Sequence, residues 1–192
     1  QEGDRIILDA STTAWHIQEG DRIILDASTT AWHIAKRLRD MELTVVTNSI
    51  RVAVALSEFE KINVISVGGQ LAKRSLSYVG PQAEANMRNY HVDKLFLSCA
   101  GLDLDRGMSD LTEQQASMRR CMLGQSDKRY LLVDHSKIGV KALAVIGGLD
   151  QLDALITDGR PPADFVEQVK MRGLQVDVVT GTNGQEDADV RD

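Results

Sequence analysis

Residues 22–49 read RIILDASTTAWHIAKRLRDMELTVVTNS, and this stretch decides the fold class. It begins with a short apolar run at 22–25, which stops at a polar loop at 26–30. A segment with apolar residues at helical spacing follows. A second apolar run at 43–46 then stops at the polar residues 47–49. Short buried strands that alternate with helices predict a parallel sheet covered on both faces.

The same alternation continues along the chain. Apolar runs predict further strands at 62–67, 94–97, 130–133, 142–146, 155–157 and 176–179, the last of them at an edge of the sheet. Helices are expected at 50–59, 81–89, 112–123 and 161–171. We therefore expect one α/β domain over residues 19–180, with a mainly parallel, doubly wound sheet and no internal boundary.

Composition excludes several classes of function. The net charge is −6, and no dense Lys/Arg stretch occurs, which argues against a free-standing nucleic-acid binder. No apolar run is long enough to cross a bilayer, and no signal peptide is recognisable, so we expect a cytoplasmic protein without membrane contact. Cys99 and Cys121 are expected to be reduced core thiols, and the four histidines lack metal-ligand spacing.

The first 34 residues contain an exact duplication. Residues 1–17 are repeated letter for letter at 18–34, whereas natural structural repeats diverge and are longer. We expect residues 1–18 to be an artefactual duplicate, extended or disordered, because the second copy continues directly into a helical pattern at 35–38. The Gly-rich, acidic tail at 181–192 is expected to be flexible.

Small polar residues at the strand ends indicate an anion-binding site. In an open parallel sheet these ends lie along one edge, where ligands bind, and helix N-termini there favour anions. The hydroxyls at 28–30 suit a phosphate cradle, although simple N-capping by Ser28 or Thr29 explains them equally well. Asp26 is expected to accept from a sugar hydroxyl or to hold the loop, because like charges repel phosphate.

Further candidates follow later strands. Lys137 offers an ammonium group for a phosphate monoester, with a solvent-facing lysine as the alternative. The ligand-binding candidates are Asp26, Ser28, Thr29, Thr30, Thr47, Asn48, Ser49, Gly68, Gly69, Asp103 and Lys137. The alternatives are a capped helix start for 47–49, a tight turn for 68–69 and a solvated turn aspartate for Asp103. Without a nucleophile elbow, Walker loop or GxGxxG, we expect no catalytic residue, no metal and no cofactor.

These motifs, in this order, resemble the C-terminal sensor domain of DeoR-family bacterial transcription regulators over about residues 19–180. The resemblance is carried by DASTT at 26–30, TNS at 47–49, GG at 68–69, YVG at 78–80, AGLD at 100–103, RR at 119–120, DHSK at 134–137 and ITD at 156–158. It implies a fold like ribose-5-phosphate isomerase and the CoA-transferases, a phosphorylated sugar as effector, and a homo-oligomer, either a dimer or a tetramer. It also implies that DNA is bound only through an N-terminal winged helix-turn-helix that this chain lacks.

The resemblance makes an effector-sensing domain the leading hypothesis, in which a bound sugar phosphate modulates DNA binding. A sugar-phosphate isomerase or deaminase on the same fold is the alternative, since fold does not decide function. A structural oligomerisation domain with a vestigial pocket is a third reading. Many family members have Gly at the position of Ser28 and Glu near Gln115, and either departure would alter the preferred sugar.

Overall fold

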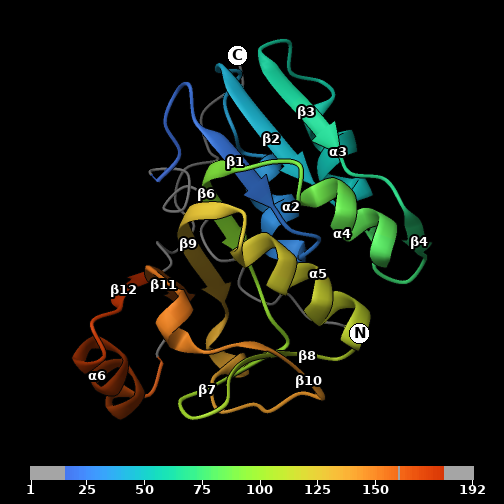
Figure 1. The fold of residues 1–192 in the computed structure, drawn as a ribbon. Helices are drawn as coiled ribbons and strands as arrows, with labels where there is room; N and C mark the ends of the chain where they lie inside the picture. The colour runs from blue at the N-terminus through green and yellow to red at the C-terminus, as the bar shows by residue number, and fades with distance from the viewer. Residues whose placement is uncertain (1–15, 160, 180–192) are drawn as a thin grey trace, which may run out of the picture.

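The computed structural model describes residues 16–159 and 161–179, and its centre is a seven-stranded parallel sheet (Figure 1). The strand order is β12-β11-β9-β6-β1-β2-β3, and every neighbouring pair is parallel. The strands are β1 Arg22–Leu25, β2 Leu43–Thr47, β3 Ile62–Ser66, β6 Val92–Leu97, β9 Ser126–Val133, β11 Ala154–Asp158 and β12 Gln175–Val179. The expected last strand does lie at an edge, as β12.

Helices cover both faces of the sheet, which confirms the doubly wound α/β fold. Side chains of α2 (Thr29–Ala35) and α3 (Ile50–Leu56) pack in one core. Those of α4 (Pro81–Met87), α5 (Glu113–Leu123) and α6 (Ala163–Met171) pack in the other. Strand residues alternate between the two cores, as Ile24 and its neighbour Leu25 do. Figure 1 shows α4 and α5 in front of the sheet and α2 behind it.

Two small antiparallel units interrupt the alternation. A hairpin of β4 (Gln70–Ala72) and β5 (Ser77–Val79) follows β3, and the apolar pattern did not predict it. A three-stranded sheet has the order β10-β8-β7, with β7 Gly101–Asp103, β8 Gly107–Asp110 and β10 Ala144–Gly147. The strand expected at 142–146 therefore exists as β10, but it pairs with β8 and not with the main sheet.

Two short 3-10 helices, η1 (His135–Lys137) and η2 (Leu149–Gln151), complete the described elements. The helix expected at 112–123 is α5, and Thr112 caps it by accepting from the backbone N–H of Gln115 at 3.3 Å. Of the first repeat copy only His16 and Ile17 are described, and Ile17 is buried in the core. The expectations for residues 1–15 and 181–192 lie outside the described residues.

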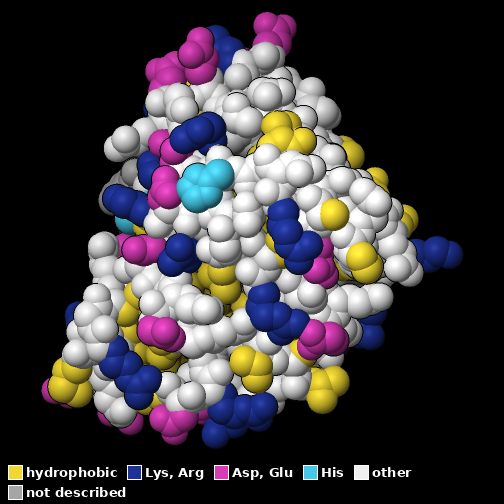
Figure 2. All heavy atoms as spheres, viewed as in Figure 1, with side chains coloured by type: hydrophobic (Ala, Val, Ile, Leu, Met, Phe, Trp, Pro, Cys, Tyr) yellow, Lys and Arg dark blue, Asp and Glu magenta, His cyan; other side chains and the backbone are white. Residues whose placement is uncertain are grey.

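The surface agrees with the charge composition. Figure 2 shows basic and acidic side chains interspersed on the face that α4 and α5 cover, without a patch of one sign. No helix among the described residues combines the length and the apolar character that a bilayer crossing requires.

Candidate effector-binding site

The strand order places a crevice at the carboxyl ends of β1 and β6. From β1 the chain adds β2 and β3 toward one edge, whereas β6, β9, β11 and β12 continue toward the other. The sheet therefore reverses its winding direction between β1 and β6. In open α/β sheets ligands bind at such a switch point, where the loops after the two strands diverge.

A cavity of about 530 Å³ lies at this switch point, and most of the residues that line it have polar or charged side chains. Hydroxyl groups line it from four parts of the chain: Ser28, Thr29, Thr30, Ser75, Ser98 and Ser136. The charged residues that line it are Arg51, Arg74, Asp110, Arg119 and Lys137. Of the candidates from the sequence, Ser28, Thr29, Thr30 and Lys137 are thus brought together at one cavity.

The loop after β1 presents unused backbone donors. Ser28 caps α2, because its Oγ accepts from the N–H of Ala31 at 3.1 Å. The N–H of Ser28 donates to Asp26 Oδ1 at 3.0 Å. The N–H groups of Thr29 and Thr30 have no acceptor within the described part of the chain. Capping by Ser28 is therefore observed, and its hydroxyl keeps a proton for an anion.

Asp26 is the centre of a buried ionic network under this loop. Its Oδ2 accepts from the N–H of Ser98 at 3.0 Å and from Arg119 Nε at 2.9 Å. Arg119 also forms an ion pair with Asp110, and all three charged side chains are nearly inaccessible to water. Burial opposes the charge on Arg119, but the carboxylates of Asp26 and Asp110 outweigh it and raise the pKa of the guanidinium. Asp26 thus holds the loop, and its bonds to the protein occupy both oxygens.

Lys137 enters the cavity from η1. Its Nζ lies 3.3 Å from Ser98 Oγ and 3.6 Å from Asp134 Oδ2. Burial alone would raise the pKa of Asp134, but the Ser136 hydroxyl and the Lys137 ammonium outweigh it and lower the pKa. Asp134 is therefore an anion that orients Lys137 toward the cavity.

The corner at Thr47–Ser49 is buried beside the cavity and does not line it. Thr47 Oγ1 donates to the carbonyl of Leu25 at 2.7 Å and accepts from the N–H of Ser49 at 3.0 Å. Ser49 caps α3, and Asn48 Nδ2 donates to the carbonyl of Tyr78 at 3.0 Å. These three residues hold β1, α3 and β5 in place.

Gly68, Gly69 and Asp103 also lie outside this cavity. Gly69 has a φ of 117°, and a Cβ at its position would lie 2.9 Å from Cβ of Ala83, so it fixes a close approach of loop and helix. Asp103 accepts from the backbone N–H groups of Asp105 and Arg106, and these bonds lower its pKa. It shapes the turn between β7 and β8.

Several lining residues were not among the candidates: Arg51, Arg74, Ser75, Ser98, Asp110 and Arg119. For one of them, the helical spacing in the sequence indicated a position that faces the interior. Arg119 lies three residues after Ala116 and four before Leu123, both buried, so helical spacing places it on the inner face of α5. Arg51 and Arg74 left no such signal, because only the tertiary structure brings α3 and the β4–β5 turn to the cavity.

Cys99 is the one thiol that lines the cavity among the described residues. Burial raises its pKa to about 12, so the thiol stays protonated and is a poor nucleophile at neutral pH. No cluster of three or more potential metal-ligating His, Cys, Asp or Glu side chains occurs in the described ranges.

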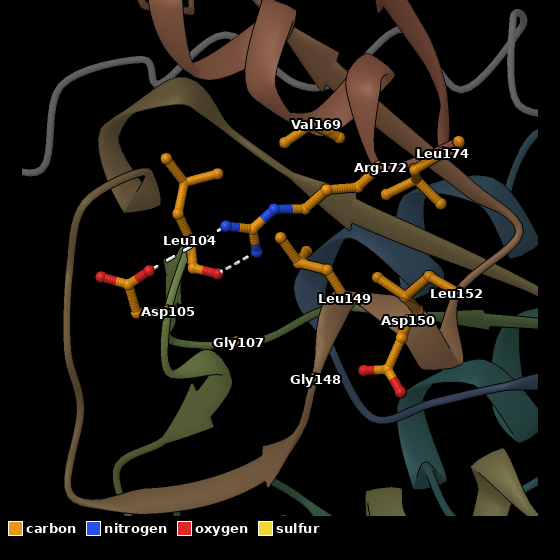
Figure 3. Close-up of a pocket in the computed structure, with 11 residues that line it drawn as sticks. Leu104, Asp105, Gly107, Gly148, Leu149, Asp150, Leu152, Val169, Arg172 and Leu174 are labelled. Carbon is orange, nitrogen blue, oxygen red and sulfur yellow. Dashed lines mark hydrogen bonds and ion pairs between the residues drawn. The ribbon is translucent and has the colours of Figure 1, made fainter.

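A second cavity, of about 290 Å³, lies between α6, η2 and the β7–β8 turn (Figure 3). Aliphatic side chains, with Leu149 and Val169 among them, line it together with glycines and the charged residues Asp105, Asp150 and Arg172. The Arg172 guanidinium donates to the carbonyl of Leu104, and its Nη2 lies 3.9 Å from Asp105 Oδ1. Asp150 points away from Arg172. The switch-point cavity is therefore the better candidate for a polar ligand.

The family model described as "DeoR C terminal sensor domain" matches residues 14–159. The chain is 50% identical over 164 residues to "Uncharacterized HTH-type transcriptional regulator YulB" of Bacillus subtilis, covering 85% of this chain and 57% of that protein. It is 37% identical over 180 residues to "Putative aga operon transcriptional repressor" of Escherichia coli O157:H7, covering 93% and 61%.

A third relative, "L-fucose operon activator" of Escherichia coli K12, is 35% identical over 163 residues, covering 85% of this chain and 60% of that protein. The chain thus spans about three fifths of each of these relatives. Among solved structures, ribose 5-phosphate isomerase A from Methanocaldococcus jannaschii aligns with a TM-score of 0.50 and 14% identity, covering 69% of this chain and 52% of that one. The isomerase from Neisseria gonorrhoeae gives 0.50 and 12%, covering 70% and 52%. At such identities the likeness concerns the fold alone.

Proposed function

The chain belongs to the family of DeoR C-terminal sensor domains, and we propose that it binds a phosphorylated sugar in the switch-point cavity as the effector domain of a transcription regulator. The match confirms the family expected from the sequence. It also confirms that the domain is not an enzyme, because the family is a sensor family and the relatives are named as regulators. The expected fold, like that of ribose-5-phosphate isomerase, is confirmed as well.

The composition of the cavity carries this proposal. A phosphate monoester brings about two negative charges at neutral pH and needs several donors. The free N–H groups of Thr29 and Thr30 supply donors beside the Ser28 hydroxyl. The remaining polar groups, including Ser98 and Lys137, match the hydroxyls of a sugar. A single site thus offers donors for the phosphate group and polar side chains for the sugar hydroxyls.

The names of the relatives support a sugar as the metabolite sensed. Two of them are named after the aga and L-fucose operons. We propose that the regulator containing this chain works in the cytoplasm, controls a sugar operon and contacts DNA through a helix-turn-helix segment outside residues 1–192. The effector would shift DNA binding by its different affinities for two states of the protein. The homo-oligomer, dimer or tetramer, stays a prediction.

Thermal unfolding with a panel of pentose and hexose phosphates tests the proposal. A true effector stabilises the folded state by about 2.7 kcal/mol at a hundredfold excess over its Kd. The variant Lys137→Ala should lose most of that gain. Lys128→Ala is the matched control, because Lys128 is an exposed lysine near the opposite end of β9. If no sugar phosphate at millimolar concentration raises the melting temperature of the unmodified protein, the proposed function is wrong.

A further inference from the structure

We propose that Arg51 and Arg74 form a clamp that binds the phosphate group at the mouth of the cavity, so that the sugar lies deeper, against Ser98 and Asp110. This inference rests on the proposed function and adds the orientation of the ligand. Both arginines line the cavity and are exposed, whereas Ser98 and Asp110 are only 2% and 6% exposed. The charged end of the ligand therefore remains near water, and its hydroxyls reach the buried polar groups.

The charges of the cavity favour this orientation. Arg119 already pairs with Asp26 and Asp110, and Lys137 has Asp134 beside it. Within residues 16–159 and 161–179, neither Arg51 nor Arg74 has a carboxylate at ion-pair distance. Two uncompensated guanidinium groups balance the dianion of a phosphate monoester, and their planar forks suit its oxygens.

Arg51 lies against an aromatic side chain of α2. Its guanidinium carbon lies 5.7 Å from the ring centroid of Trp32. Trp32 belongs to α2, whose first residues Thr29 and Thr30 line the same cavity as Arg51, so this contact ties Arg51 to the helix that begins at the cavity.

Arg74 is carried by the turn at 73–76, which α3 holds from one side. The N–H of Ile50 donates to the carbonyl of Leu76 at 2.9 Å, and the N–H of Tyr78 donates to the carbonyl of Asn48 at 2.8 Å. Leu76 has a φ of 48° and is the one non-glycine residue with a positive φ in the described part of the chain. A residue keeps such a backbone conformation only where its surroundings impose it, often at a ligand site.

The same turn is held from its other side by α5. Gln115 Nε2 donates to Ser75 Oγ at 2.9 Å and to Ser77 Oγ at 3.0 Å. The Gln115 side chain thus fixes the turn that carries Arg74. The sequence candidates Asn48 and Gly69 do not line the cavity: Asn48 bonds to β5 of the hairpin, and Gly69 lies against Ala83 of α4 just before β4.

The test measures how much the phosphate group adds to binding. The affinity of the protein for ribose 5-phosphate, for ribose and for inorganic phosphate is measured by calorimetry. If another sugar phosphate of the panel stabilises the protein more, that compound and its unphosphorylated sugar are used in place of ribose 5-phosphate and ribose. The variants are the double Arg51→Gln/Arg74→Gln, Lys137→Gln, and Lys73→Gln as the control. Lys73 lies in the same turn, is exposed and does not line the cavity.

We expect the double variant to lower the affinity for the sugar phosphate by about tenfold or more and to leave the affinity for the parent sugar unchanged. Lys137→Gln should lower the affinity for the sugar phosphate and for the parent sugar by the same factor, so that the ratio of the two affinities is kept. Lys73→Gln should change neither affinity. Melting curves without ligand check that each variant is folded. If the double variant keeps the phosphate preference, or if Lys137→Gln abolishes it, the clamp is wrong while the proposed function stands. If no sugar phosphate binds to the unmodified protein, the proposed function itself fails.

Discussion

The variant Arg119→Met probes the buried ionic network under the candidate site. In the unmodified protein Arg119 pairs with Asp26 and Asp110, and the three residues are 8%, 1% and 6% exposed. Methionine retains much of the apolar stem but leaves both carboxylates buried without a counter-charge. Breaking a buried pair by removing one partner destabilises a protein by about 3–5 kcal/mol. This is a large share of the typical total stability of about 5–15 kcal/mol.

Urea unfolding measures the effect. With a slope of about 2 kcal/mol per M, the expected loss moves the midpoint down by about 2 M. The control is Arg120→Met, because Arg120 is the next residue of α5 but its side chain is 39% exposed, and its partner Glu113 is 72% exposed. That surface pair is worth about 1 kcal/mol or less.

A second background separates charge from packing. In the double variant Asp26→Asn/Asp110→Asn, the same Arg119→Met change should be far less harmful, because no buried anion is left unpaired. An equal loss in both backgrounds would refute the electrostatic reasoning and assign the effect to packing. A loss below about 1 kcal/mol in the unmodified background would show that water or structural relaxation satisfies the carboxylates.

Three further outcomes are expected. Gly69→Ala should lower the urea midpoint, because its φ is 117° and the added Cβ meets Ala83 at 2.9 Å; an unchanged midpoint would contradict the strain. Cys99, with a pKa raised to about 12 by burial, should react with iodoacetamide at pH 8 only after unfolding, and rapid labelling of folded protein in mass spectrometry would argue otherwise. Hydrogen bonds from Arg22 lower the pKa of Asp93 to about 2, so the stabilisation by this pair is present above pH 3.8 and is lost as the pH falls through 2. An NMR titration of the Arg22→Gln variant should show the pKa of Asp93 rising toward 3.8, and an unchanged pKa would contradict the pairing.

The local pattern of the chain determined the main sheet and the helices. The alternation within residues 22–49 requires only neighbouring residues, and it correctly predicted β1, α2 and β2. Helix caps are local for the same reason, since a cap side chain reaches an N–H three residues away, as Ser28 and Thr112 do. The meeting of Ser28 and Lys137 at one cavity also followed, because all carboxyl ends of parallel strands share one edge.

The tertiary structure alone decided which strand ends face the cavity and which charges reach it. The strand order puts the switch point between β1 and β6, so residues 47–49 after β2 became supports instead of lining groups. The strand at β10 joined a separate sheet, and Arg51 and Arg74 arrived from a helix and a hairpin turn. The physical reason is that propensity and periodicity describe a residue's neighbours along the chain, whereas a binding site is made of contacts between residues far apart in sequence.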